Sequence, residues 1–176
     1  MVNEQENTLD ALQIAIQMEI DGKEYYLKAG QDSTNEMGKK LFQSLAQAED
    51  VHRKKFSDIY ETIRSDKDWP MIIFPPDSGK EIKTVFALAA EKSASEIIPL
   101  DTELEAVQTA MSMENKTLDY YKTREGTAGN ATEKDFYESL ASEEREHYLI
   151  LLDYYEYLKD PAGWFVKTEH TSLDGG

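Results

Sequence analysis

The sequence predicts an all-α fold, a four-helix bundle built from two helix hairpins that are related by a pseudo-twofold axis and joined by one long crossover. In four long segments, apolar side chains recur at alternating steps of three and four residues, as on a helix with one buried face. Two intervals between these segments are short polar turns, and the third is the 36-residue stretch 65–100. Residues 9–52 and 104–147 also match at a fixed offset of 95, with fifteen identities in 44 positions and no gap, which indicates a duplicated hairpin.

The first predicted helix runs from Thr8, which can cap it, to about Ala29. A polar turn at residues 30–35 leads to a second helix that ends near Arg64. We call the line of repeating positions on each helix its seam. The seam of the first helix is Leu9, Leu12, Ile16, Glu19, Lys23 and Tyr26, and that of the second is Phe42, Leu45, Glu49, His52, Phe56, Ile59 and Ile63.

Residues 65–100 form the crossover, because Pro70, Pro75 and Pro76 forbid a continuous helix there. Helical spacing within residues 80–96 predicts one short extra helix in it. The crossover is long enough to travel the length of the bundle. One such connection between two hairpins is the connectivity of ferritin-like bundles, so we predict a ferritin-like four-helix bundle.

The second hairpin begins near Asp101 or Thr102, turns at residues 126–130, and continues from Thr132 to about Lys159. Its seams are Leu104, Val107, Met111, Glu114, Leu118 and Tyr121, and then Tyr137, Leu140, Glu144, His147, Leu151, Tyr154 and Leu158. We expect a single domain over residues 1–176, with the bundle at about 8–160. The tail, 161–176, contains Trp164 and is expected to fold back on the bundle.

Composition narrows the possible functions. The chain has a formal net charge of −16, which disfavours nucleic acid and anionic lipid as partners. It has no cysteine, and therefore no disulfide and no zinc-thiolate or iron–sulfur site. The first residues lack the basic start and apolar run of a signal peptide, and no apolar run reaches the length of a transmembrane helix. We therefore expect a cytoplasmic protein without a membrane partner.

Four carboxylates and two imidazoles interrupt the apolar seams as two matched sets. Glu49 precedes His52 by three residues, so both lie on one helix face, and the same spacing recurs 95 residues later. A single glutamate on each remaining helix repeats at the same offset. The candidate metal ligands are Glu19, Glu49, His52, Glu114, Glu144 and His147.

These six residues favour a pair of metal ions over a structural role. A lone polar residue in a core is commonly a hydrogen-bonded exception, but four carboxylates at one depth would repel one another and lose hydration. Two divalent ions balance four carboxylates, with the histidines as neutral ligands. Oxygen and nitrogen ligands without thiolate suit iron or manganese, and the same arrangement is typical of ferritin-like dinuclear proteins. A bundle in which the site only stabilises the fold is the structural alternative.

Other polar residues are not predicted to be metal ligands. His170 has no partner at ligand spacing and is expected on the surface, and Asp50 and Glu146 are expected to be solvated charges. Glu143 is a candidate acceptor for the N–H of the imidazole on the other hairpin, because a metal-bound histidine usually needs one. Its counterpart in the repeat is an alanine. The seam tyrosines, Tyr26 and Tyr121, are expected to be core residues with a bonded hydroxyl.

With these motifs in this order, the sequence resembles the rubrerythrin branch of the ferritin-like di-iron superfamily over roughly residues 8–160. The resemblance rests on Met18-Glu19, Glu49-x-x-His52, Met113-Glu114 and Glu144-x-x-His147. It implies two iron ions that react with peroxide or dioxygen. It also implies that Glu49 and Glu144 bridge the ions and that the two histidines are terminal ligands.

The chain departs from the rubrerythrin pattern in two ways. Typical members carry a rubredoxin-like domain with two Cys-x-x-Cys pairs, whereas this chain has no cysteine, so electrons must come from an external donor protein or from substrate iron. Typical members also carry an additional glutamate one turn after the third-helix ligand. Thr117 stands there, and Gly22 stands at the symmetric position of the first helix, which leaves peroxidase activity of the usual kind open.

The sequence therefore favours a di-iron oxidoreductase that reduces hydrogen peroxide or activates dioxygen. Two alternatives use the same ligands: a ferroxidase or iron-storage protein, which for storage needs a hollow assembly of many subunits, and a dimanganese catalase-like enzyme, since manganese accepts these ligands. We expect a homodimer formed through helix faces, because symmetric bundles commonly associate in this way.

Overall fold

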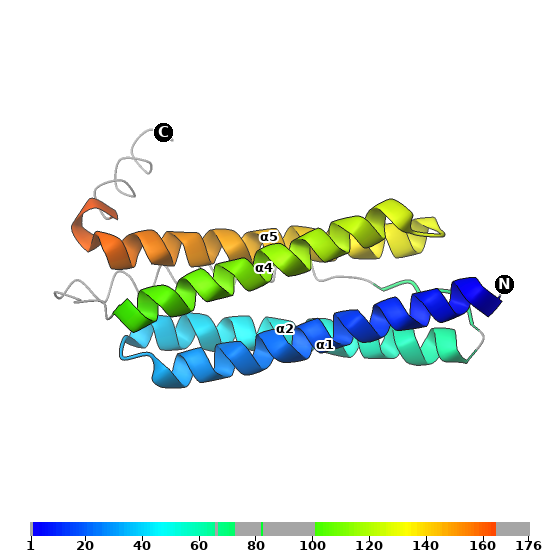
Figure 1. Cartoon of the computed structure of the whole chain (residues 1–176), viewed down its shortest axis with the longest axis horizontal. Helices are drawn as coiled ribbons and strands as arrows, with labels where there is room; N and C mark the ends of the chain where they lie inside the picture. The colour runs from blue at the N-terminus through cyan, green and yellow to red at the C-terminus, as the bar shows by residue number, and fades with distance from the viewer. Residues whose placement is uncertain (1, 66, 73–81, 83–100, 165–176) are drawn as a thin grey trace.

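The computed structural model describes residues 2–65, 67–72, 82 and 101–164. Within these ranges the chain contains no strand and forms four long helices, shown in Figure 1. They are α1 (Val2–Asp32), α2 (Glu36–Arg64), α4 (Asp101–Thr127) and α5 (Ala131–Lys159). No helix in the described part of the chain has an apolar stretch long enough to cross a membrane. The predicted short helix at residues 80–96 lies outside the described residues, apart from residue 82.

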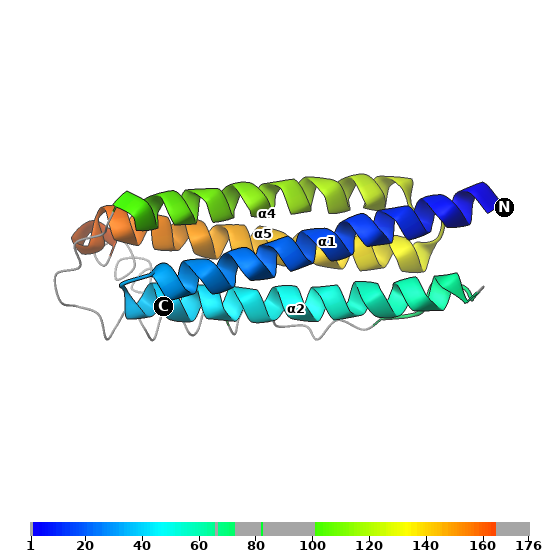
Figure 2. The same cartoon turned by 60° about the horizontal axis from the view of Figure 1, so that its bottom comes forward.

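The helices pack as two antiparallel hairpins. Helix α1 lies along α2 and α4 lies along α5, and the hairpins meet through contacts of α1 with α4 and of α2 with α5. Figures 1 and 2 show the two hairpins side by side from two directions. This arrangement, together with the long connection between α2 and α4, confirms the prediction of an all-α, ferritin-like bundle.

The helices extend further than the sequence predicted. Helix α1 starts at Val2, so Thr8 lies inside the helix and the prediction that it caps the helix is wrong. The residues before Thr8 include no glycine or proline that would stop a helix. The side chain of Gln5 donates a hydrogen bond to the carbonyl of Ile63 (2.9 Å), which joins the additional turns to the end of α2.

Both hairpin turns end in an asparagine cap. The side-chain oxygen of Asn35 accepts from the backbone N–H of Met37, and that of Asn130 accepts from the N–H of Glu133, each at 2.9 Å. These contacts satisfy N–H groups that have no partner within the first turn of a helix. The two asparagines are 95 residues apart, so the caps follow the sequence repeat.

Hydrogen bonds between the hairpins repeat in the same way. The hydroxyl of Tyr25 on α1 donates to the carbonyl of Ala106 on α4, and that of Tyr120 donates to Ala11, both at 2.8 Å. Within the hairpins, Gln13 donates to the Tyr60 hydroxyl, and residues 108 and 155 form the equivalent bond, both at 2.9 Å. Each pair is related by the offset of 95, which supports the pseudo-twofold relation.

The core consists of two apolar clusters, one toward each end of the bundle. The cluster near the α1–α2 turn includes Tyr26, Phe42, Leu45, Val107, Leu151 and Tyr154. The cluster toward the other end includes Leu12, Phe56, Ile59, Tyr121, Tyr137 and Leu140. On every seam, the predicted metal ligands fall between residues of the first cluster and residues of the second, so they form a polar layer between two apolar ones.

The chain beyond α5 turns back at Asp160, where the last long helix has ended as predicted. Residues 161–164 are helical again. The Trp164 ring packs edge-on against Tyr157, at 5.5 Å between centroids, and its N–H donates to Asp153 at 2.7 Å. This part of the predicted tail therefore lies against α5. Residues 165–176, including His170, lie outside the described residues.

A buried polar group that the sequence did not predict lies where the α1–α2 turn meets the start of α4. One carboxylate oxygen of Glu103 accepts from the Ser33 hydroxyl (2.6 Å) and from the Tyr154 hydroxyl (2.7 Å). Gly38 of α2 packs directly on this group. A Cβ atom there would overlap the Tyr154 hydroxyl and the Glu103 carboxylate, so this helical position requires glycine.

We expect Gly38→Ala to lower the free energy of unfolding by about 1–3 kcal/mol, because the added methyl group has no room. Gly126→Ala is the matched control, since a Cβ atom at Gly126 meets nothing within 4 Å. There the higher helix propensity of alanine predicts a gain of about 0.5–1 kcal/mol. Guanidinium unfolding curves measure both changes. A Gly38→Ala protein as stable as the wild type would contradict this packing.

Candidate metal centre

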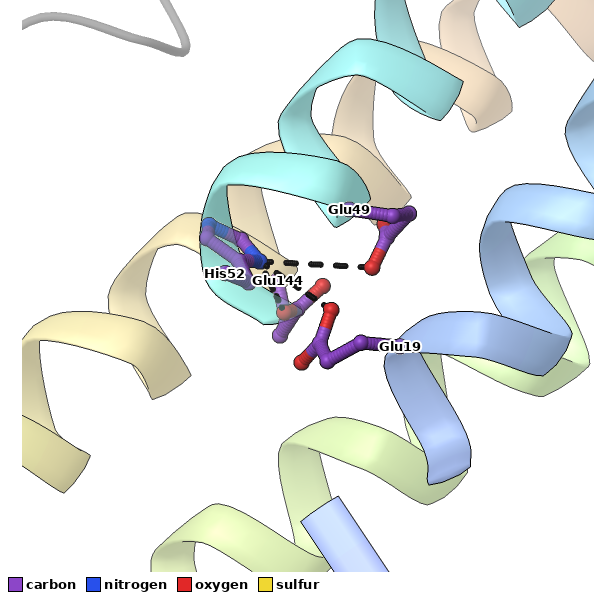
Figure 3. Close-up of side chains that lie close together, drawn as sticks. All are labelled: Glu19, Glu49, His52 and Glu144. Carbon is purple, nitrogen blue, oxygen red and sulfur yellow. Dashed lines mark ion pairs between the residues drawn. The ribbon is translucent and has the colours of Figure 1, made fainter. Parts of the chain in front are cut away.

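The structure brings the six predicted ligands together in the middle of the bundle. One glutamate comes from α1 and one from α4, and a Glu-x-x-His pair comes from each of α2 and α5. All six residues are at most 4% exposed: Glu19, Glu49, His52, Glu114, Glu144 and His147. Figure 3 shows four of them, from α1, α2 and α5, directed toward one another. The helical spacing explains this, because polar ligands replace one apolar seam position on α1 and on α4 and two on α2 and on α5.

The potential ligand atoms form two overlapping groups. Glu19, Glu49, His52 and Glu144 form the first, and the second contains Glu49, Glu144, Glu114 and His147. Within each group, one atom per residue lies within 4.8 Å of all the others. Glu49 and Glu144 belong to both groups. Two ion positions that share two carboxylates are therefore compatible with this geometry.

Both imidazoles turn the same nitrogen toward the carboxylates. The Nδ1 atom of His52 lies 3.2 Å from Oε1 of Glu144 and 3.4 Å from Oε2 of Glu19. The Nδ1 atom of His147 lies 3.2 Å from the other oxygen of Glu144 and 3.6 Å from Oε1 of Glu49. The two rings are nearly parallel, with centroids 5.8 Å apart. Each histidine thus offers Nδ1 as its ligand atom.

Three buried ligand atoms have no hydrogen-bond partner, which is the observation that tests the fit of a cation. Oε2 of Glu19, Nδ1 of His52 and Oε1 of Glu144 are inaccessible to solvent and make no hydrogen bond, although the histidine nitrogen lies 3.4 Å and 3.2 Å from the two oxygens. Leaving such atoms unsatisfied costs about 1–3 kcal/mol each. Carboxylate oxygens and a neutral imidazole nitrogen are the atoms that iron or manganese binds. The donor set therefore fits a pair of such ions.

Burial and the charges of neighbouring glutamates favour the protonated form of two of the four carboxyl groups. Burial, followed by the negative charges of Glu19 and Glu144, raises the pKa of Glu49 well above its usual range. Burial and the charge of Glu144 raise the pKa of Glu114 in the same direction. Without a bound cation these carboxyl groups therefore retain protons at a pH where an exposed glutamate is ionised.

Two buried tyrosines hold the single glutamates. The Tyr26 hydroxyl on α1 donates to Glu114 on α4, and the Tyr121 hydroxyl on α4 donates to Glu19 on α1. Burial and the neighbouring carboxylates raise the pKa of both tyrosines well above the usual range, so each remains a donor. The prediction of core tyrosines with bonded hydroxyls is confirmed. That the bonds cross between the hairpins and end on the candidate ligands was not predicted.

The structure also shows the contacts of two polar residues outside the ligand set, Glu143 and Asp50. Oε2 of Glu143 lies 2.7 Å from Nε2 of His52, as expected for an acceptor from the other hairpin. The interpretation of Asp50 as a simple solvated charge is wrong. Its carboxylate contacts Lys23 (2.7 Å), Arg53 (3.2 Å) and Lys54 (2.8 Å). The hydrogen bonds from Lys23 and Lys54 hold its pKa well below the usual range.

The two positions where the chain departs from the rubrerythrin pattern contribute no carboxylate. The Thr117 hydroxyl donates to the carbonyl of Met113 (3.1 Å) within its own helix. Gly22 lies beside the cluster, because a Cβ atom there would be 3.5 Å from the carboxylate of Glu49. Among the described residues, the groups able to hold a metal ion therefore contain only the six predicted ligands.

Replacing two of the buried carboxylates should stabilise the metal-free protein. We expect Glu49→Gln/Glu114→Gln to raise the free energy of unfolding of the metal-free protein at neutral pH by about 1 kcal/mol or more, because glutamine removes two buried groups that folding must either protonate or bury as charges. Metal content, measured by elemental analysis after purification, should fall. Glu24→Gln, on the exposed face of α1, is the control and should change stability by less than about 0.5 kcal/mol. A destabilised metal-free double variant would contradict the electrostatic description of the cluster.

In the comparison with known proteins, one family model matches most of the chain. The model of the family described as Rubrerythrin matches residues 10–155. This range contains all six residues of the cluster and most of each long helix. The searches of the curated proteins and of the solved structures each gave no match.

Proposed function

The chain belongs to the rubrerythrin family, and from this premise we propose that it is a non-haem di-iron oxidoreductase that reduces hydrogen peroxide or activates dioxygen. The observation that carries the proposal is the pair of overlapping ligand groups that share Glu49 and Glu144. The proposed ligands are the six residues of the cluster. When bound, two iron ions would supply the two electrons that convert one peroxide, with two protons, to two molecules of water.

Charge balance supports two divalent ions. The four glutamates of the cluster carry four negative charges when ionised, and two ions at 2+ neutralise them while the histidines remain neutral. The raised pKa values of Glu49 and Glu114 reflect burial first and then the charges of neighbouring glutamates, and bound cations would offset both effects. A single divalent ion would leave two negative charges in a layer between apolar clusters, at a high cost in solvation.

The residues around the cluster would orient the ligands and exclude water. Tyr26 and Tyr121 each fix one glutamate by a hydrogen bond from the opposite hairpin. The aromatic ring of Phe56 packs at a tilt of 36° against Tyr121, with 5.5 Å between centroids, and Phe42 stacks on Tyr26 at 6.1 Å. Each tyrosine is therefore held on its ring as well as its hydroxyl. Such support preorganises a site so that little rearrangement accompanies the reaction.

The source of electrons lies outside this chain. These 176 residues contain no cysteine and hence no thiolate-bound iron that could pass electrons to the cluster. We propose an external donor protein, and the net charge of −16 favours a donor with a basic surface. The homodimer and the cytoplasmic location expected from the sequence stay predictions.

Peroxide should oxidise the reduced, iron-loaded protein stoichiometrically. Anaerobic addition of peroxide to protein loaded with Fe²⁺ should consume about one peroxide per two iron ions, followed by absorbance of ferric iron in the near ultraviolet. Glu49→Ala/Glu144→Ala removes both shared carboxylates and should abolish this rapid phase. Manganese rather than iron in protein purified without added metal would favour the catalase-like alternative. Iron-loaded protein inert to both peroxide and dioxygen would refute the proposal.

A further inference from the structure

The two histidines of the cluster are equivalent in the sequence repeat, but their outer nitrogens have different surroundings. Nε2 of His52 lies 2.7 Å from a carboxylate oxygen of Glu143. Nε2 of His147 is inaccessible to solvent and makes no hydrogen bond. Both rings are at most 1% exposed, so water does not compensate for this difference at their surface.

The difference originates in one position of the repeat. Glu143 on α5 directly precedes a ligand of the cluster, and the residue 95 positions earlier, on α2, is Ala48. The Glu143 side chain reaches across to the histidine of α2. By the pseudo-twofold relation, residue 48 occupies the corresponding place beside His147. A methyl group cannot accept a hydrogen bond, so the second histidine lacks this contact.

The contact should strengthen His52 as a ligand. In both histidines Nδ1 faces the carboxylates of the cluster, so a bound ion would take Nδ1 and leave the proton on Nε2. A carboxylate that accepts this proton fixes the tautomer and the ring orientation and makes the ligand nitrogen more basic. Glu143 has a 16% exposed side chain, which places the hydrogen bond at the edge of the core.

We propose that Glu143 is a positioning residue that makes the two metal positions unequal. The ion bound by His52 and Glu19 is held more tightly than the ion bound by His147 and Glu114, and at limiting metal the first position fills first. This inference rests on the proposed function, because it requires that the cluster holds two ions. It predicts the order in which the two metal positions fill, which the nearly symmetric set of ligands alone does not predict.

Anaerobic calorimetric titration with Fe²⁺ tests this order. The wild-type protein should bind about two ions in two resolved steps. Glu143→Gln should weaken the tighter step by about 10–100-fold and leave the weaker step unchanged, so that the two steps converge. Ala48→Glu supplies the missing acceptor beside His147 and should tighten the weaker step. Circular dichroism and thermal unfolding check that each variant is folded.

Proton NMR of the Fe²⁺-loaded protein gives a readout that a purely structural role would not change. The two imidazole N–H protons should give two exchangeable, paramagnetically shifted signals, and only the one assigned to His52 should have the chemical shift of a proton that is hydrogen-bonded to a carboxylate. Glu143→Gln should move this signal while the His147 signal stays. If Ala48→Glu fails to fold, the Glu143→Gln comparison still decides the inference.

The outcomes separate this inference from the proposed function. Wild-type protein that binds no Fe²⁺ refutes the proposed function. Wild-type protein that binds two ions with equal affinity, or a Glu143→Gln protein in which both steps weaken equally, refutes the inference and leaves the di-iron proposal standing.

Discussion

Mutual repulsion of four carboxylates in one buried layer is the constraint on which the rest of the structure depends. The glutamates of the cluster are almost fully removed from water, and burial raises the pKa of Glu49 and Glu114. Apolar residues in these positions would join the two core clusters into one. The chain instead retains buried charges that cost stability unless a cation neutralises them. This cost supports the proposal that the cluster binds a pair of metal ions.

The duplicated hairpin explains how a small chain builds this layer. One hairpin supplies a glutamate and a Glu-x-x-His pair. The second hairpin, related to the first by the pseudo-twofold axis, supplies an equivalent set. The tyrosine on each hairpin bonds the glutamate of the other, so the ligands hold their positions only when both hairpins are docked. The shared Glu49 and Glu144 lie where the two sets overlap. The duplicated hairpin thus provides the six ligands in pairs. The surroundings of the two histidines differ, because Glu143 on α5 corresponds to Ala48 on α2.

Sequence reasoning predicted the helices, their pairing and the six cluster residues, because periodicity and a fixed offset are local properties of a chain. It placed the start of α1 too late, since no residue before Thr8 marks a boundary and the stabilising contact of Gln5 with Ile63 is 58 residues away. The contact of Asp50 with Lys23 and the packing of Gly38 on Tyr154 were missed for the same reason. The contacts of Asp50 with Arg53 and Lys54, three and four residues later on the same helix, follow from helical spacing and could have been predicted. Such contacts depend on how the helices are oriented about their axes, and the spacing of residues along one helix does not determine which long side chain reaches which partner.

The most direct test of the account is the position of bound metal. Crystals of the protein grown with iron, measured at the iron absorption edge, should show two anomalous difference peaks inside the bundle, each flanked by carboxylate oxygens of Glu49 and Glu144 and each next to one histidine Nδ1. A separation of about 3.5–4 Å is expected for two ions that share carboxylates. The absence of peaks in the cluster, with iron bound only at the acidic surface, would contradict the central claim and leave the buried carboxylates without a metal to explain them.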